Sequence, residues 1–218
     1  MINALIVIAA VILLGALLFF EKKEHNIGKL LTKTPLSVLF VLAAFVQPRP
    51  QEWYFNLIFA GLILCLAGDV FLVFSSSKTF LVGLVSFLLG HVLYVSAFVV
   101  ATHLKTWLSW PALVVLAAGA AIFLFYLRPH LGEMFKPVLA YIVVISLMVI
   151  GALAVFLTPE IPRRGALMVL LGALLFYLSD IFVARDRFVS PGYVNRRFGL
   201  PMYYAGQFLL AFSVGQLA

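Results

Sequence analysis

Charged residues are scarce in this chain of 218 residues: they make up 11% of it, whereas soluble domains usually carry about 25%. Hydrophobic residues make up 65%, so there are too few polar side chains to cover a soluble globule of this size. The apolar residues also fall in long uncharged blocks instead of being spread evenly. The composition therefore excludes an ordinary soluble domain and predicts an integral membrane protein.

Cysteine and histidine are also rare. Cys65 is the only cysteine, which excludes an internal disulfide, a cysteine-ligated metal cluster and a CxxC redox pair, and we expect it to serve in packing. His25, His103 and His130 fall in predicted loops, which leaves His91 as the one histidine in an apolar segment. A zinc site built from several histidines is therefore not expected, and no metal or cofactor is predicted. The sequence also contains no GxSxG, HExxH or P-loop motif.

The net charge of +7 does not predict nucleic-acid binding, because the basic residues lie in short stretches between apolar blocks. Orientation in the membrane is the commoner reason for such a pattern. We expect no nucleic-acid partner.

Eight apolar segments are candidates for membrane-spanning helices, for which roughly 20 mostly apolar residues are needed. They predict an all-α protein with a single transmembrane domain over residues 1–218. The first segment has no basic n-region and is too long for a signal peptide, so we expect it to be retained. The eight predicted segments are Ile2–Phe20, Pro35–Gln47, Trp53–Phe74, Thr79–Ala101, Leu108–Leu127, Phe135–Leu157, Gly165–Ala184 and Pro201–Leu217.

Lysine and arginine predict the orientation, since cytoplasmic loops of membrane proteins are enriched in both. The first, third, fifth and seventh connections between the eight segments carry 11 of the 15 basic residues, and the other three connections carry 4. We therefore expect the odd-numbered connections in the cytoplasm and both termini on the opposite side. The expected location is a bacterial inner membrane.

A weak internal repeat relates the two halves of the chain. The segment GLVSFLLGHVL from Gly83 aligns without gaps with GLPMYYAGQFL from Gly199, and similar motifs surround Asp69 and Asp180. The pattern predicts two parallel halves of four helices, with a shared site between them. Chance similarity between apolar segments is the alternative.

Asp69 and Asp180 are the only two of the eight acidic residues that lie within apolar segments. A charged Asp near the bilayer centre costs roughly 2.5 to 3.5 kcal/mol, so such residues usually face the interior of a bundle and mark a functional site. The predicted topology places both near the cytoplasmic ends of parallel helices, at the same depth. We therefore expect them to face each other across a cavity bordered by His91 and Gln207.

Two further helices carry polar residues at helical spacing. Phe87, His91 and Tyr94 share one face of the predicted fourth helix, which places an imidazole and a phenol inside the membrane. Tyr203 and Gln207 are four residues apart in the last helix. A hydrogen-bonded core histidine, and hydrogen bonds between helices, are the structural alternatives to a role in the site.

Four other residues are candidates for supporting roles. Tyr141 belongs to an apolar stripe that either packs or lines a pocket, and Tyr177 lies one turn before Asp180. Lys33 and Lys136 flank helix ends, where they either meet a lipid phosphate or anchor the helix.

The two buried acids indicate a type of chemistry. The ionised form of a carboxyl group is disfavoured at low dielectric, and two neighbouring carboxyls resist losing both protons. One is then expected to stay protonated, so that the pair can donate a proton and activate water, as in glycosidases and aspartic proteases. The residues therefore favour acid–base hydrolysis.

Five motifs surround these residues: GDVFL from Gly68, FxxGLxxFxxGHxxY from Phe80 to Tyr94, PVLAYIVVISLM from Pro137, GALLFYLSD ending at Asp180, and YYAGQ from Tyr203. Together they resemble the lysoplasmalogenases of the YhhN-like membrane protein family over most of the chain. The resemblance implies eight transmembrane helices and hydrolysis of the vinyl ether bond of a lysophospholipid within the bilayer, which releases a fatty aldehyde. In this chemistry Asp69 and Asp180 would act as acid and base in either order. His91, Tyr177 and Gln207 would position water or tune the acids.

The alternative is a transporter or lipid-binding protein in which the two acids relay protons. Transporter repeats often carry interrupted helices. The predicted placement of Pro35, Pro137 and Pro201 at helix starts favours a rigid enzyme instead.

Overall fold

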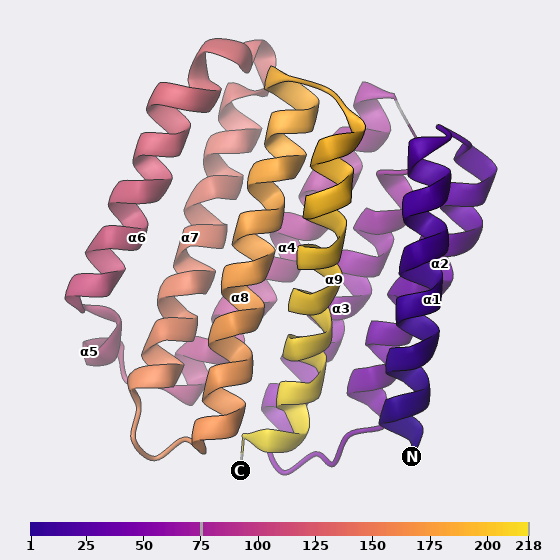
Figure 1. The fold of residues 1–218 in the computed structure, drawn as a ribbon. Helices are drawn as coiled ribbons and strands as arrows, with labels where there is room; N and C mark the ends of the chain where they lie inside the picture. Colours follow the sequence, from indigo (N-terminus) through magenta and orange to yellow (C-terminus); the bar gives the residue numbers. More distant parts are fainter. Residues whose placement is uncertain (75, 218) are drawn as a thin grey trace.

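The computed structural model describes residues 1–74 and 76–217, and these form helices without a strand. Eight long helices pack side by side, and both chain termini lie at the same end of the bundle (Figure 1). The short helix α5 (Leu104–Trp107) lies at that end, before α6. The long helices are α1 (Ile2–Lys22), α2 (Asn26–Phe45), α3 (Glu52–Phe71), α4 (Ser77–Ala101), α6 (Trp110–Ala121), α7 (Phe135–Leu157), α8 (Arg163–Ala184) and α9 (Tyr193–Ser213).

Two long helices continue as π-helical turns at the end of the bundle opposite the termini. The turn η1 (Ile122–Leu127) extends α6, and η4 (Arg185–Val189) extends α8. Three short 3₁₀ turns complete the helical elements of the described residues: η2 (Arg128–His130), η3 (Gly132–Met134) and η5 (Val214–Gln216).

Seven helices of the described part of the chain are long and apolar enough to cross a membrane. They correspond to the first seven predicted segments. The eighth prediction, Pro201–Leu217, falls on α9, which is not among the seven. Helix α9 is more polar because its first two turns carry Asn195, Arg196 and Arg197, and its buried face carries further polar side chains. It packs most closely against α8, within the bundle (Figure 1).

Helix α2 begins well before the predicted start at Pro35. His25 caps it, because the His25 Nδ1 atom accepts a hydrogen bond of 3.0 Å from the Gly28 N–H. Lys33 therefore lies inside α2 and not at its first turn. The prediction of a helix start at Pro201 is likewise wrong, since α9 begins at Tyr193. Both helices run without interruption through their prolines, so of the three prolines expected at helix starts Pro137 alone lies near one.

Two pairs of helices cross at glycines. On α3 and α4, a Cβ atom at Gly61 would lie 3.1 Å from the Gly90 carbonyl oxygen, and a Cβ at Gly90 would lie 3.1 Å from the Gly61 oxygen. On α8 and α9, a Cβ at Gly172 would lie 3.0 Å from the Gly206 oxygen, and the converse distance is 2.8 Å. The absence of side chains at these positions lets the two backbones meet, as in small-residue contacts of membrane helices.

Two further contacts join helices that are far apart in the sequence. Helix α4 packs on α7, and α9 packs on α2. This arrangement brings polar residues of α2, α3, α7 and α9 toward the middle of the bundle, where the candidate site lies.

Candidate active site

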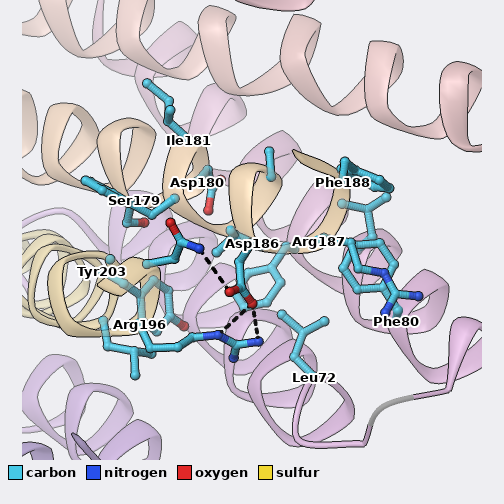
Figure 2. A pocket seen from close by; sticks show the side chains of 18 of the residues that line it. Leu72, Phe80, Ser179, Asp180, Ile181, Asp186, Arg187, Phe188, Arg196 and Tyr203 are labelled. Atoms are coloured by element: carbon cyan, nitrogen blue, oxygen red, sulfur yellow. Dashed lines mark hydrogen bonds and ion pairs between the residues drawn. The ribbon is translucent and has the colours of Figure 1, made fainter. Parts of the chain in front are cut away.

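A cavity of about 380 Å³ opens among the helices, toward the end of the bundle opposite the two termini. This volume lies within the range of small-molecule sites. Asp69 of α3 and Asp180 of α8 both line the cavity, and Figure 2 shows Asp180 near Ser179 and Tyr203. The structure therefore places both acids at the same cavity.

Asp69 is held by three side chains from two other helices. The Lys33 Nζ atom lies 3.0 Å from Asp69 Oδ1. The hydroxyls of Ser37 and Tyr203 each donate a 2.6 Å hydrogen bond to Asp69 Oδ2. Asp69 is only 1% exposed, so these three donors replace the water that a free carboxylate would bind.

Asp180 has a different surrounding. Its Oδ2 atom accepts one hydrogen bond, of 2.5 Å, from the Tyr141 hydroxyl of α7. It is partly exposed to the cavity, whereas Asp69 is buried. No ion pair to Asp180 is found within the described residues. The two acids therefore differ in charge environment, although both line the same cavity.

A hydrogen-bonded chain leads from Asp69 into the core. Gln207 Nε2 donates to the Tyr203 hydroxyl at 3.2 Å, and the Tyr94 hydroxyl donates to Gln207 Oε1 at 3.0 Å. Cys65 Sγ lies 3.7 Å from the Tyr94 hydroxyl and ends the chain. Gln207 and Tyr94 do not line the cavity, so their contact with Asp69 runs through Tyr203.

His91 is fully buried and does not border the cavity, which differs from the sequence-based expectation. Its ring packs on Phe176 and Tyr141, with centroid distances of 4.5 and 5.3 Å. Neither ring nitrogen has a hydrogen-bond partner among the described residues. The physical reason is position along α4: Phe87 lines the cavity, and His91 lies one turn deeper in the core.

Tyr177 and Lys136 also differ from each other in placement. Tyr177 lines the cavity, but its hydroxyl lies 3.5 Å from Ser146 Oγ. Lys136 is exposed and lies outside the cavity, so the structure does not bring it to the other candidates. Its charge stays in solvent because it is at the first turn of α7, on the face away from the bundle.

Sequence reasoning missed Ser37 and Tyr204. Ser37 Oγ, which donates to Asp69, also lies 3.2 Å from the Tyr204 hydroxyl. Ser37 follows Lys33 by four residues in α2, so the two side chains share one helix face. This spacing would have indicated Ser37 if the helix had been predicted to extend through Lys33.

Sequence reasoning also missed a group of charged residues at the mouth of the cavity. Arg196 binds Asp186 through two nitrogens, at 2.7 and 2.9 Å, and Asn195 donates to Asp186 at 3.1 Å (Figure 2). Glu21 of α1 lies 3.4 Å from Lys29 and 3.7 Å from Arg196. These residues were assigned to connections because they interrupt the apolar runs, although most belong to helices.

The rest of the cavity wall is apolar. Leu72 at the end of α3, Phe80 and Leu84 of α4, and Ile142 and Ile145 of α7 contribute to it. Such a wall suits an alkyl chain, and the two carboxyls at its inner part suit proton transfer. Within residues 1–74 and 76–217, no group of three or more His, Cys, Asp or Glu side chains is placed to hold a metal ion. The expectation of a site without metal or cofactor stays a prediction.

Comparison with known proteins adds a second line of evidence. Residues 28–214 match the YhhN family. A protein of Bos taurus named lysoplasmalogenase TMEM86A is 35% identical over 181 residues, which cover 80% of this chain and 72% of the relative. The Homo sapiens protein of the same name is 32% identical over 185 residues, with the same two coverages. No solved structure matches this chain.

Proposed function

Because this chain belongs to the YhhN family, we propose that it is a membrane hydrolase of the lysoplasmalogenase type. Its substrate would be a lysoplasmalogen within the bilayer, and its products a fatty aldehyde and glycerophosphoethanolamine or glycerophosphocholine. The observation that carries the proposal is the shared cavity of Asp69 and Asp180, with an apolar wall for the alkenyl chain.

The reaction needs one acid and one base. A protonated carboxyl gives its proton to the β carbon of the vinyl ether, which produces an oxocarbenium ion. Water then attacks this ion while the ionised carboxyl takes the proton of the water, and a hemiacetal forms. When the hemiacetal collapses, its hydroxyl proton returns to the first carboxyl and the second protonates the leaving glycerol oxygen. Both carboxyls then have their starting protonation.

The surroundings of the two acids support an assignment of these roles. Asp69 faces the ammonium of Lys33 at 3.0 Å and two hydroxyl donors, an environment suited to an ionised carboxylate. Asp180 has only the neutral Tyr141 hydroxyl as partner and faces the cavity. We assign the general acid to Asp180, and to Asp69 the carboxylate that stabilises the cation and activates water.

The internal repeat is consistent with unequal surroundings of the two acids. Phe87 of α4 aligns with Tyr203 of α9 in the repeat, and Phe87 cannot donate a hydrogen bond. Each acid still accepts from one tyrosine, so the ammonium of Lys33, which faces Asp69, would be the main difference between them. The glycine crossings Gly61–Gly90 and Gly172–Gly206 support this repeat of four and four helices, because they fall at aligned positions of the two halves.

Membrane topology belongs to the same proposal. We take α9 as an eighth crossing, so that both termini lie on the non-cytoplasmic side of a bacterial inner membrane. The cavity would then open toward the cytoplasm, where the basic connections lie. Reporter fusions at the C-terminus test this, and a fusion active only in the cytoplasm would contradict it.

The alternative is a proton-coupled transporter or lipid-binding protein that uses the same two acids. The internal repeat favours it, whereas the uninterrupted course of α2 and α9 favours the enzyme. Transport of protons or lipid into liposomes by a protein that releases no aldehyde would replace the hydrolase with the carrier.

The direct test is incubation of the purified protein in detergent with a lysoplasmenyl lipid, with aldehyde measured over time. A saturated lysophospholipid of the same chain length is the control. In D₂O the released aldehyde should carry one deuterium on the carbon next to the carbonyl, because the acid protonates that carbon. Absence of aldehyde from any lysoplasmenyl lipid would overturn the assignment.

A further inference from the structure

The charges at the cavity mouth do not balance. Lys29 pairs with Glu21, and Arg196 pairs with Asp186 and also approaches Glu21. Arg187 lines the same mouth, and no carboxylate of the described residues lies within ion-pair distance of it. The mouth therefore has one positive charge in excess, and that charge belongs to Arg187.

Neutral contacts hold the Arg187 side chain in place. Its guanidinium carbon lies 4.4 Å from the centroid of the Phe80 ring, and its Nη2 atom lies 3.5 Å from Ser77 Oγ. Figure 2 shows the Arg187 side chain beside Phe80. An arginine stacked on an aromatic face keeps its N–H groups in a planar fork, which matches the oxygens of a phosphate.

The two lysines for which the sequence left open either a lipid phosphate or helix anchoring are not available to bind a phosphate in the cavity. Lys33 is 5% exposed and engaged with Asp69, and Lys136 lies outside the cavity. Arg187 follows Asp180 by seven residues along α8 and η4, a separation on the order of 10 Å along a helix axis. The glycerol and phosphate units of a lysophospholipid would occupy this gap.

We propose that Arg187 is the phosphate-binding residue of the cavity and recognises the phosphodiester of a lysophospholipid whose chain lies along the apolar wall. This deepens the proposed function and rests on it for the identity of the lipid. The excess charge at the mouth is neutralised by the single negative charge of the phosphodiester. The phosphate then fixes how far the lipid enters, and so which bond reaches the two acids.

The test is a binding measurement on the full-length protein in detergent, with a fluorescent saturated lysophospholipid as the probe. Unlabelled saturated lysophosphatidylethanolamine and a monoacylglycerol with the same chain compete for the site. The quantity of interest is the ratio of their affinities, because the two lipids differ in the phosphate head group. Inorganic phosphate is the third competitor and separates a free anion from a lipid head group.

Wild type should prefer the lysophospholipid, and Arg187→Ala and Arg187→Gln should lower that preference by about tenfold or more. Arg197→Ala is the matched control, since Arg197 is exposed at the same end of the bundle and does not line the cavity. It should leave the preference unchanged. Thermal unfolding of each variant checks folding, and we expect both Arg187 variants to fold because Arg187 is exposed.

An unchanged preference in both Arg187 variants would overturn the proposal. The lipid assignment would be overturned if wild type bound the two lipids with equal affinity while inorganic phosphate still displaced the probe. Because saturated lipids report binding and not turnover, these outcomes are independent of aldehyde release. Repeating the measurement in an Asp180→Asn background removes any remaining hydrolysis, so failure of the proposed function and failure of this proposal are distinguished.

Discussion

Lys33 of α2 and Asp69 of α3 form a buried ion pair, with 3.0 Å between Lys33 Nζ and Asp69 Oδ1. Removal of one partner of such a pair leaves a charge without compensation, which costs about 3 to 5 kcal/mol. We expect Lys33→Met to lower the free energy of unfolding by this order and to reduce aldehyde release strongly. Thermal or denaturant unfolding in detergent measures the first effect.

The pair is tested further by a double-mutant cycle. In an Asp69→Asn background, Lys33→Met should cost far less stability, because no buried carboxylate is then left without a partner. Lys136→Met is the control for loss of a lysine, since Lys136 is exposed outside the cavity. Equal costs of Lys33→Met in both backgrounds would contradict an ionised Asp69.

The Lys33 pairing shows where sequence reasoning stops. Helix α7 was predicted with its observed bounds, Phe135–Leu157. Its residues form a continuous apolar run because it faces lipid on one side and the apolar core on the other. The prediction for α2 was too short and the prediction for α9 began too late, because each helix carries polar side chains on its buried face. A criterion of apolar length does not recognise helices that face a polar site.

The site was only partly predictable for the same reason. Asp69 and Asp180 stood out because a lone acid in an apolar run is costly. Their partners are set by contacts between helices distant in sequence, such as Tyr203 on Asp69, and no local pattern shows those contacts. Residue spacing predicted the helix face of His91 and so placed it at the cavity. Its distance from the cavity along α4 depends on how the helices pack, which the spacing does not show.

A second prediction concerns the tyrosines that hold the acids. Tyr203→Phe removes the hydroxyl that donates to the Asp69 carboxylate at 2.6 Å, and Tyr141→Phe removes the hydroxyl that donates to the Asp180 carboxyl at 2.5 Å. Hydrogen bonds to charged groups contribute about 1.5 to 3 kcal/mol, and Asp180 becomes charged when it gives up its proton, so we expect each variant to lose aldehyde release by roughly tenfold or more. Tyr126→Phe, at a partly exposed position outside the cavity, should leave activity unchanged. Equal activity of all three variants would show that the hydroxyls play no part.

A third prediction concerns the crossing of α8 and α9. A Cβ atom at Gly206 would lie 2.8 Å from the Gly172 carbonyl oxygen and 3.1 Å from the Phe176 nitrogen, so the two backbones must separate to admit it. We expect Gly206→Ala to lower the unfolding temperature and to reduce activity, because α9 carries Tyr203. Gly15→Ala is the control, since a Cβ there meets no atom within 4 Å. If Gly206→Ala is as stable as Gly15→Ala, the close crossing is not a determinant of the fold.

The central claim is that Asp69 and Asp180 act as one catalytic unit, and aldehyde release from a lysoplasmenyl lipid by Asp69→Asn, Asp180→Asn and the double variant tests it most directly. The amide keeps the size of the side chain but neither donates an acidic proton nor accepts one. Each single change should reduce turnover by about 10²- to 10⁴-fold while the protein still folds. The double variant should lose little more, because groups that act together are not additive. Near-native aldehyde release by either single variant would contradict the claim.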